Sequence, residues 1–211
     1  MKNKLFIISI ISILFIHPPS AKGQAFIYSQ PRIMVGGNAA LFRISFDEFE
    51  SIYRDRVDWS YGGFAGMRTF SNYYLLVKYN TFNQEGKNGV HPETGADLSK
   101  ARWQEGWLCL GLRNHPPLTR KTHSYFGFGL VFFNVNENAQ ISLFEEKSVK
   151  KDSGLGNGFF LELGLEYFFY QQLAAFFEIE ISSGGTRGKT GFESLSIGGY
   201  RFALGLTFWP F

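Results

Sequence analysis

Acidic and basic side chains recur within otherwise apolar segments of the sequence, where charge is costly to place. Around them, apolar residues alternate with small or polar ones, so the charges share a face with glycine and alanine. These residues are Glu105, Glu162, Glu166, Glu178 and Glu180, with Arg68, Lys78, Arg113 and Arg201. Because an isolated buried charge costs several kcal/mol, charges confined to one interior must pair. The set predicts either a structural network of ion pairs or a gated path for ions.

We place Glu178 at the centre of this network. If the last two apolar segments form a hairpin symmetric about its loop, Arg201 lies opposite Glu178, and Glu162 flanks Glu178 on the other side. Glu180 and Lys78 complete the predicted lumenal set. A structural role is the simpler interpretation, because networks of ion pairs need not be functional.

A glycine-rich stretch at 183–190, SGGTRGKT, resembles a phosphate-binding loop but lacks two of its requirements. That motif begins with glycine so that the backbone can wrap the phosphates, whereas position 183 is serine. The stretch also leads into a predicted strand and not into the helix whose N-terminus would hold the phosphate. We interpret it as an exposed loop.

The histidines and the single cysteine form no recognisable catalytic or metal-binding pattern. His123 and Ser124 are adjacent and would point to opposite faces of a strand, while His91 and His115 lie in other segments. Cys109 has no partner for an intramolecular disulfide and is expected to behave as a small buried residue. The sequence therefore predicts no catalytic residue, no metal ion, no cofactor and no enzymatic activity.

The N-terminus has the layout of a secretory signal peptide. Two lysines precede an apolar run at 5–16, and Ala21 and Gly23 supply the small residues that a signal peptidase reads. The run is too short and wrongly flanked for a bilayer-spanning helix. We expect residues 1–23 to be removed and 24–211 to form one mature domain.

Charge and composition exclude one class of partner and favour strands. The leader holds three of the 21 bases and none of the 18 acids, which leaves 18 of each in the mature chain. A net charge of zero gives no support for a nucleic-acid partner. Aromatic residues make up 18% of the chain, and no later apolar stretch approaches the roughly 20 residues that a spanning helix needs.

Hydrophobic alternation with a period of two residues defines the elements that must position the charges. Segments of about ten to twelve residues have the length that a tilted membrane strand requires. In the clearest, Phe159, Leu161, Leu163, Leu165 and Tyr167 share one face, opposite Glu162 and Glu166. The eight segments are 32–42, 57–68, 72–82, 103–113, 123–134, 158–168, 172–182 and 198–209.

The connections alternate between long and short, as they do in an outer-membrane barrel. The long polar loops are 43–56, 83–102, 135–157 and 183–197, and an even strand count returns both ends to the periplasmic side. Aromatic residues are expected to form a girdle at each membrane interface. The short-turn girdle comprises Tyr73, Tyr125, Tyr167, Tyr170, Phe208 and Trp209, and the long-loop girdle Trp59, Tyr61, Phe82, Trp103 and Phe159.

The leader, the eight alternating segments and the C-terminal phenylalanine resemble the small outer-membrane barrels of the OmpA/OmpX type, over roughly residues 30 to 211. The resemblance implies that the barrel-assembly machinery recognises the end of the last strand, here Phe208, Trp209 and Phe211. The sequence departs from that pattern in one respect, because Phe211 is out of phase with Phe208 and follows Pro210.

We therefore predict an all-β fold, an eight-stranded antiparallel transmembrane β-barrel with up-and-down meander topology. It would be a monomer embedded in outer-membrane lipid. A barrel of this size is just wide enough to be filled by side chains, so a plugged lumen is expected. The predicted function is structural, or interaction with surface ligands through the four long loops.

Three alternatives remain open. Phe64, Trp107 and Phe133 on the small-residue faces are compatible with a narrow channel or a carrier for small, apolar solutes. Some barrels of this size are lipid A-modifying enzymes. A soluble lipocalin-like carrier would turn its apolar face inward around a ligand.

Overall fold

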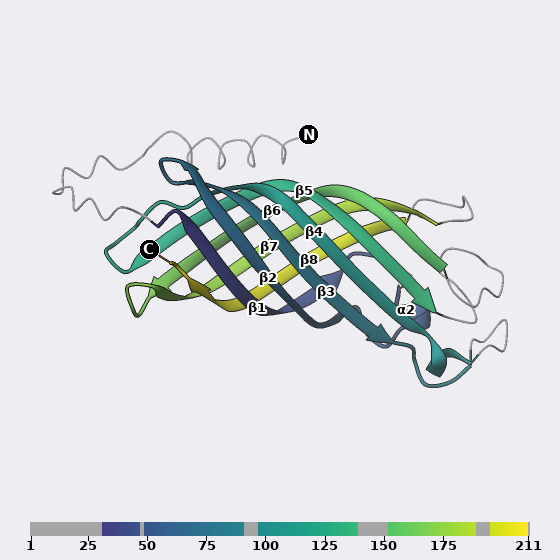
Figure 1. Cartoon of the computed structure of the whole chain (residues 1–211). Helices are drawn as coiled ribbons and strands as arrows, with labels where there is room; N and C mark the ends of the chain where they lie inside the picture. Colours follow the sequence, from purple (N-terminus) through teal and green to yellow (C-terminus); the bar gives the residue numbers. More distant parts are fainter. Residues whose placement is uncertain (1–30, 47–48, 91–96, 139–151, 189–194, 211) are drawn as a thin grey trace, which may run out of the picture. The chain divides into compact units, whose positions relative to one another are not determined.

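The computed structural model describes residues 31–46, 49–90, 97–138, 152–188 and 195–210. The predicted signal peptide, 1–23, lies outside these residues. Eight strands form a closed barrel in chain order, with every neighbouring pair antiparallel and β1 paired with β8 (Figure 1). The strands are β1 Ile33–Ile44, β2 Val57–Phe70, β3 Tyr73–Glu85, β4 Arg102–Asn114, β5 Thr122–Asn138, β6 Asp152–Phe168, β7 Leu173–Gly188 and β8 Leu195–Phe208.

The two helical elements are short: α2 at Phe49–Ile52, and a 3₁₀ turn at Leu98–Lys100. None of the helices in the described part of the chain is long and apolar enough to cross a membrane. The short turns β2–β3, β4–β5 and β6–β7 gather at one end of the barrel, here called the short-turn end, and α2 lies at the other, the long-loop end (Figure 1). The predicted eight-stranded meander is confirmed.

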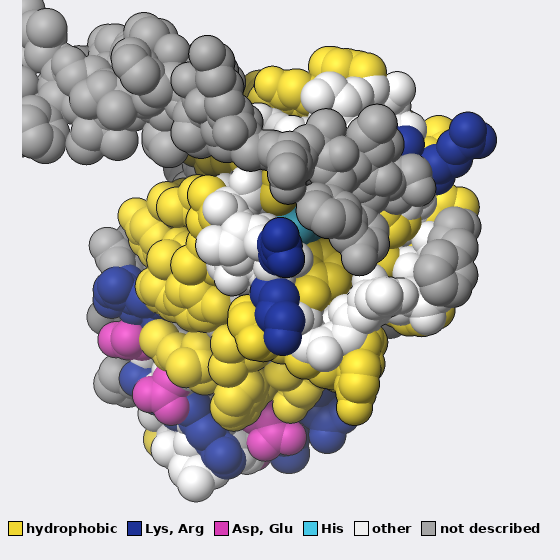
Figure 2. Space-filling view, turned by 90° about the vertical axis from the view of Figure 1, so that its left-hand side faces the viewer, with side chains coloured by type: hydrophobic (Ala, Val, Ile, Leu, Met, Phe, Trp, Pro, Cys, Tyr) yellow, Lys and Arg dark blue, Asp and Glu magenta, His cyan; other side chains and the backbone are white. Residues whose placement is uncertain are grey.

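The apolar face of the wall points outward. On β6 the predicted outer residues, from Phe159 to Tyr167 at every second position, are 50–69% exposed, while Glu162 and Glu166 are buried. Figure 2 shows hydrophobic side chains over much of the face seen from the short-turn end. A soluble barrel would expose the opposite face, so the lipocalin-like alternative is wrong. The outer face of the wall is apolar, as contact with lipid requires.

The strands are longer than predicted on the long-loop side. β5 continues to Asn138 and β6 begins at Asp152, within the predicted loop 135–157. β7 continues to Gly188 and β8 begins at Leu195, within the predicted loop 183–197. The polar and glycine-rich residues of these stretches suggested loops, but they pair in continuous register above the apolar band.

Four of the predicted girdle residues point into the barrel instead. Tyr125 and Trp209 at the short-turn end, and Phe82 and Trp103 at the long-loop end, are at most 2% exposed. Strand alternation decides their side, because each is in phase with lumenal residues of its own strand, as Phe82 is with Lys78. Several of the others are outward and exposed, as predicted: Trp59, Tyr61, Phe159, Tyr167, Tyr170 and Phe208.

The predicted register of the last hairpin is wrong by two residues. Arg201 lies opposite Glu180, and Glu178 lies opposite Ala203. Glu162 likewise faces Glu180 across the β6–β7 pair. A two-residue shift keeps the same face inward, so the hydrophobic pattern does not distinguish the two registers.

Candidate functional site: the charged lumen

The middle of the lumen holds a cluster of three bases and three carboxylates, hereafter the lumenal network: Lys78, Arg113, Arg201, Glu162, Glu178 and Glu180. The bases stand on β3, β4 and β8, and the carboxylates on β6 and β7, so the contacts cross the barrel. All six residues are at most 2% exposed. Equal numbers of the two signs allow every charge to be compensated locally.

Lys78 and Arg113 each join more than one carboxylate. Lys78 Nζ lies 2.5 Å from Glu162 Oε2, 2.8 Å from Glu178 Oε1 and 2.5 Å from Glu180 Oε2. Arg113 donates to Glu162 Oε1 from Nε at 2.6 Å and to Glu178 Oε2 from Nη2 at 2.9 Å. These are charge-assisted hydrogen bonds in a region without bulk water, where they are stronger than at a surface.

Arg201 ties the network to the β1–β2 side of the barrel. Its Nη1 lies 3.3 Å from Glu178 Oε1 and 3.6 Å from Glu180 Oε2. Its Nε donates to Ser60 Oγ at 3.3 Å, and its Nη2 donates to the side chain of Asn38. One guanidinium thus links β8 to β7, β2 and β1.

Glu178 accepts hydrogen bonds from four donors. Besides Lys78, Arg113 and Arg201, the hydroxyl of Tyr125 donates to its Oε2 at 3.1 Å. The Tyr125 ring also lies under the Arg113 guanidinium, with 4.1 Å between the guanidinium carbon and the ring centroid. That distance suits a cation–π contact.

The structure brings together all five predicted network residues, Lys78, Glu162, Glu178, Glu180 and Arg201. Arg113 was placed on the lumenal face from the sequence but not in the network. Tyr125 was assigned to the membrane girdle, although its alternation with Phe126 and Phe128 was a signal for the inner face.

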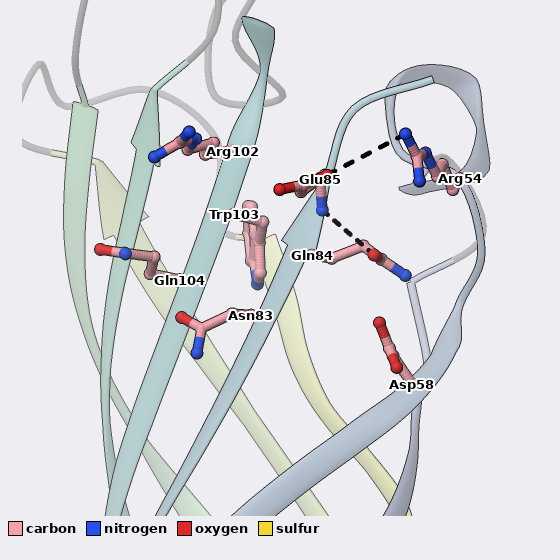
Figure 3. A pocket seen from close by; sticks show the side chains of 8 residues that line it. All are labelled: Arg54, Asp58, Asn83, Gln84, Glu85, Arg102, Trp103 and Gln104. Carbon is pink, nitrogen blue, oxygen red and sulfur yellow. Dashed lines mark hydrogen bonds and ion pairs between the residues drawn. The ribbon is translucent and has the colours of Figure 1, made fainter. Parts of the chain in front are cut away.

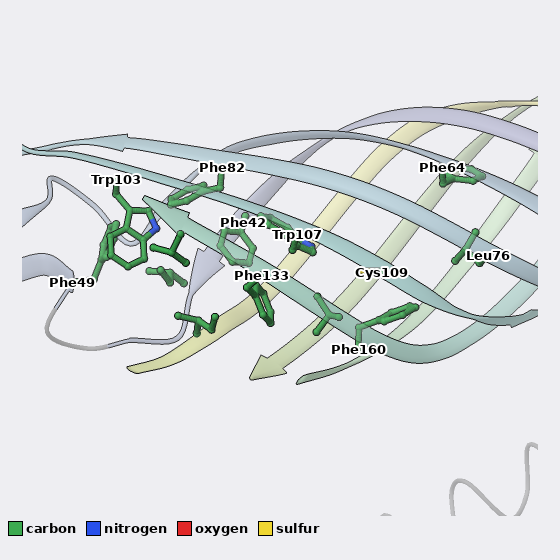
Figure 4. Packing of buried hydrophobic residues seen from close by; sticks show 14 of the residues in the cluster. Phe42, Phe49, Phe64, Leu76, Phe82, Trp103, Trp107, Cys109, Phe133 and Phe160 are labelled. Atoms are coloured by element: carbon green, nitrogen blue, oxygen red, sulfur yellow. The ribbon is translucent and has the colours of Figure 1, made fainter. Parts of the chain in front are cut away.

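Aromatic side chains fill the lumen between the network and the long-loop end (Figure 4). Phe42 lies 5.0 Å from both Phe82 and Trp107, measured between ring centroids. Trp107 Nε1 donates to Glu180 Oε1 at 3.4 Å, which joins this aromatic cluster to the network. Phe133 and Trp107, which suggested a carrier for apolar solutes, are buried among these side chains.

Helix α2 closes the aromatic cluster from the long-loop end. Phe49 stacks on Tyr53 at 4.5 Å and meets Trp103 edge-on at 5.4 Å. The Tyr53 hydroxyl donates to Glu137 Oε1 at 2.8 Å. Burial and the neighbouring Glu137 carboxylate both raise the pKa of Tyr53 above its ordinary value, so this hydroxyl keeps its proton at neutral pH.

The predicted assembly signal divides between the two sides of the wall. Phe208 is outward and 46% exposed, whereas Trp209 is buried and donates from Nε1 to Glu166 Oε1 at 3.3 Å. Phe211 lies outside the described residues.

A pocket of about 400 Å³ lies at the long-loop end of β2, β3 and β4 (Figure 3). Its lining is polar and carries both signs of charge. Most of it consists of outward-facing side chains above the apolar band, and Arg54 Nη2 lies 4.0 Å from Glu85 Oε2 across it. The lining residues are Arg54, Asp58, Asn83, Gln84, Glu85, Arg102, Trp103 and Gln104.

A closed eight-stranded meander with an apolar outer face and a charged, side-chain-lined interior is the fold of the small outer-membrane β-barrels. The predicted class and its outer-membrane location are confirmed at that level. No family model matches the chain, and no curated protein matches it.

Solved structures of outer-membrane proteins have a similar fold. Neisserial surface protein A superposes with a TM-score of 0.56 and 13% identity, over 84% of this chain and 97% of that one. OprG from Pseudomonas aeruginosa has a TM-score of 0.52 and 13% identity, over 85% and 96%. Ail of Yersinia pestis, with the heparin analogue sucrose octasulfate, has a TM-score of 0.50 and 11% identity, over 85% and 99%. The likeness concerns the fold.

Proposed function

We propose that this protein is a plugged outer-membrane barrel that acts as a structural or surface-interaction protein through its long loops. The observation that carries the proposal is the succession of side chains along the lumen. Aromatic rings fill the long-loop half, six paired charges cross the middle, and further rings and a histidine lie at the short-turn end. An ion passing through would have to displace buried, mutually compensated charges, which is costly.

The interaction surface lies above the apolar band. The pocket lined by Arg54, Glu85 and Arg102 offers donors and acceptors of both charges to a polar ligand. Among the proteins of similar fold, Ail is the attachment invasion locus protein and was crystallised with a heparin analogue. That supports surface recognition as one role that this fold accommodates.

Conductance across a planar lipid bilayer tests the plugged lumen. We expect the folded protein to give no discrete current steps at voltages where a porin, added to the same membrane, gives clear ones. Heat-denatured protein supplies the background. Reproducible steps from the folded protein alone would contradict the plug and favour the channel alternative.

A hydrated path for small solutes is the second candidate, and one observation favours it. Within the described residues, Nδ2 of Asn38 and both side-chain polar atoms of Asn80 are buried without a hydrogen-bond partner. Buried polar groups in this state are commonly served by water. Liposome swelling with neutral sugars and amino acids separates this candidate from the first, since a plugged barrel leaves the swelling rate at that of empty liposomes.

We propose that the barrel has no catalytic role in lipid A modification. Mass spectrometry of lipid A from cells with and without the protein tests this proposal. An identical set of lipid A species supports it, and a mass change that depends on the protein contradicts it.

A further inference from the structure

Two histidines and a glutamate meet at the short-turn end of the lumen, outside the lumenal network. His115 follows the last residue of β4, and His123 is the second residue of β5. Glu166 on β6 is the direct cross-strand partner of His123. The β4–β5 turn carries His115 back over this pair, where its backbone N–H donates to the carbonyl of Asn72 in the neighbouring turn at 2.8 Å.

The two imidazoles approach through the same ring nitrogen. His115 Nδ1 and His123 Nδ1 are 3.3 Å apart. Two nitrogens that each lie 2.0–2.1 Å from a tetrahedral zinc ion are separated by about 3.3 Å. This distance between the two Nδ1 atoms is compatible with two ligands of one metal ion, and equally with a hydrogen bond between the two rings.

Glu166 supplies a carboxylate oxygen aimed into the same space. Its Oε1 accepts from Trp209 Nε1, and Oε2 is buried beside the His115 imidazole. His115 Nε2 lies 2.8 Å from that Oε2, and the Thr207 side chain lies beside the carboxylate. A buried carboxylate oxygen needs a donor or a cation, and His115 is the partner that serves Oε2 when no metal ion is bound.

We infer that His115, His123 and Glu166 form a binding site for a divalent late first-row transition metal such as Zn²⁺. One ligand atom from each residue lies within 4.8 Å of the others. Imidazole nitrogen with one carboxylate is a ligand set that zinc, copper and nickel accept and that magnesium and calcium do not favour. Water would complete the coordination.

The surroundings of the cluster favour an ordered site. His115 is 2% exposed and packs against Tyr125 and Trp209, with ring centroids 5.7 and 5.1 Å away. Such packing fixes the ring that must present its nitrogen. His123 is half-buried, so its ring is less enclosed than that of His115.

Zinc binding by the detergent-folded protein, prepared without a polyhistidine tag, is the test. Competition with a chromophoric zinc chelator gives the stoichiometry and the affinity. We expect one Zn²⁺ per chain. Mutating a residue that only hydrogen-bonds to a metal-bound histidine typically lowers metal affinity by about 10–100-fold. His123→Gln removes a ligand itself, so it should weaken zinc binding by at least about tenfold. Glu166→Gln should weaken it as well.

His91→Gln is the matched control, because residue 91 belongs to the connection between β3 and β4 and is not one of the three proposed site residues. It should bind zinc like the wild type. Equal weakening in His91→Gln, undiminished binding in His123→Gln, or no stoichiometric binding by the wild type would overturn the site and leave a hydrogen-bonded histidine pair. Unchanged heat-modifiable mobility in gels checks that each variant is folded.

A second readout reports the ligands directly. With Cu²⁺ in place of Zn²⁺, electron paramagnetic resonance should show coupling to two nitrogens in the wild type and to one in His123→Gln. An identical spectrum from both proteins would overturn the assignment even if copper binds.

Discussion

Glu178 accepts hydrogen bonds from Lys78, Arg113, Arg201 and Tyr125. We therefore expect substitutions at its partners to have large effects on the stability of the barrel. Removing one partner from this buried, compensated set leaves an excess charge of one sign in the barrel interior. Such a change typically costs about 3–5 kcal/mol, far more than the loss of a surface ion pair.

Arg201→Glu should therefore destabilise the barrel by at least about 3–5 kcal/mol, because it places a fourth carboxylate beside three. Arg102→Glu is the control, since Arg102 is exposed at the rim. The measurement is urea unfolding in lipid vesicles. Equal shifts of the unfolding midpoint for the two variants would show that the network contributes little.

Tyr125→Phe removes one donor to Glu178 and keeps the ring under Arg113. A hydrogen bond to a charged group contributes about 1.5–3 kcal/mol, so the free energy of unfolding should fall by that amount. Tyr167→Phe changes an outward, exposed tyrosine and should have almost no effect. The same urea titration compares them, and indistinguishable variants would contradict the contact.

At the scale of elements, α2 depends on its tertiary contacts. Four residues are too few for a stable isolated helix, so Phe49 and Ile52 must hold it in the mouth of the barrel. Two backbone hydrogen bonds report on it: Tyr53 N–H to Phe49 O at 3.0 Å, and Lys87 N–H to Ile52 O at 2.9 Å.

Phe49→Ala should release α2, because the stacked and edge-on contacts of Phe49 with Tyr53 and Trp103 are lost. We expect faster hydrogen exchange at the amides of Tyr53 and Lys87. Leu118→Ala, at an exposed position in a short turn, is the control and should leave both rates unchanged. Retained protection in Phe49→Ala would mean that the rest of the loop holds the helix in place.

Sequence alternation was sufficient for the number, order and facing of the strands, because lipid outside and a packed lumen inside impose a two-residue period on each, but it missed their polar ends on the long-loop side. It was insufficient for α2, whose four residues carry no period. It was also insufficient for contacts such as Lys78 with Glu162, which lie 84 residues apart and cross the barrel. The proximity of His115 and His123 was missed for a related reason, since a turn and a strand bring together two rings that the sequence places in separate segments.

The girdle errors have a different origin. Tyrosine and tryptophan suit both a headgroup interface and a lumen that offers a hydrogen-bond partner. Trp103 is in phase with Glu105, and Trp209 with Thr207, so the strand period already indicated their side. For aromatic residues in a narrow barrel, phase is a better guide than residue type.

At the scale of the whole molecule, the closed ladder from β1 to β8 leaves no free sheet edge. We expect the folded protein to resist sodium dodecyl sulfate at room temperature and to change its electrophoretic mobility only after boiling. Fractionation of inner and outer membranes before the gel gives its location. A single mobility under both conditions, or recovery in the soluble fraction, would contradict the membrane barrel.

The outer wall has an uneven height. On β2 the large apolar outward residues continue to its first residue, Val57. On β5 they end at Phe132, and the strand runs on to Asn138 with asparagines facing outward, about 20 Å further along the chain. β5 thus continues beyond its apolar outward residues with polar ones, so this part of the strand presents side chains suited to water and not to lipid.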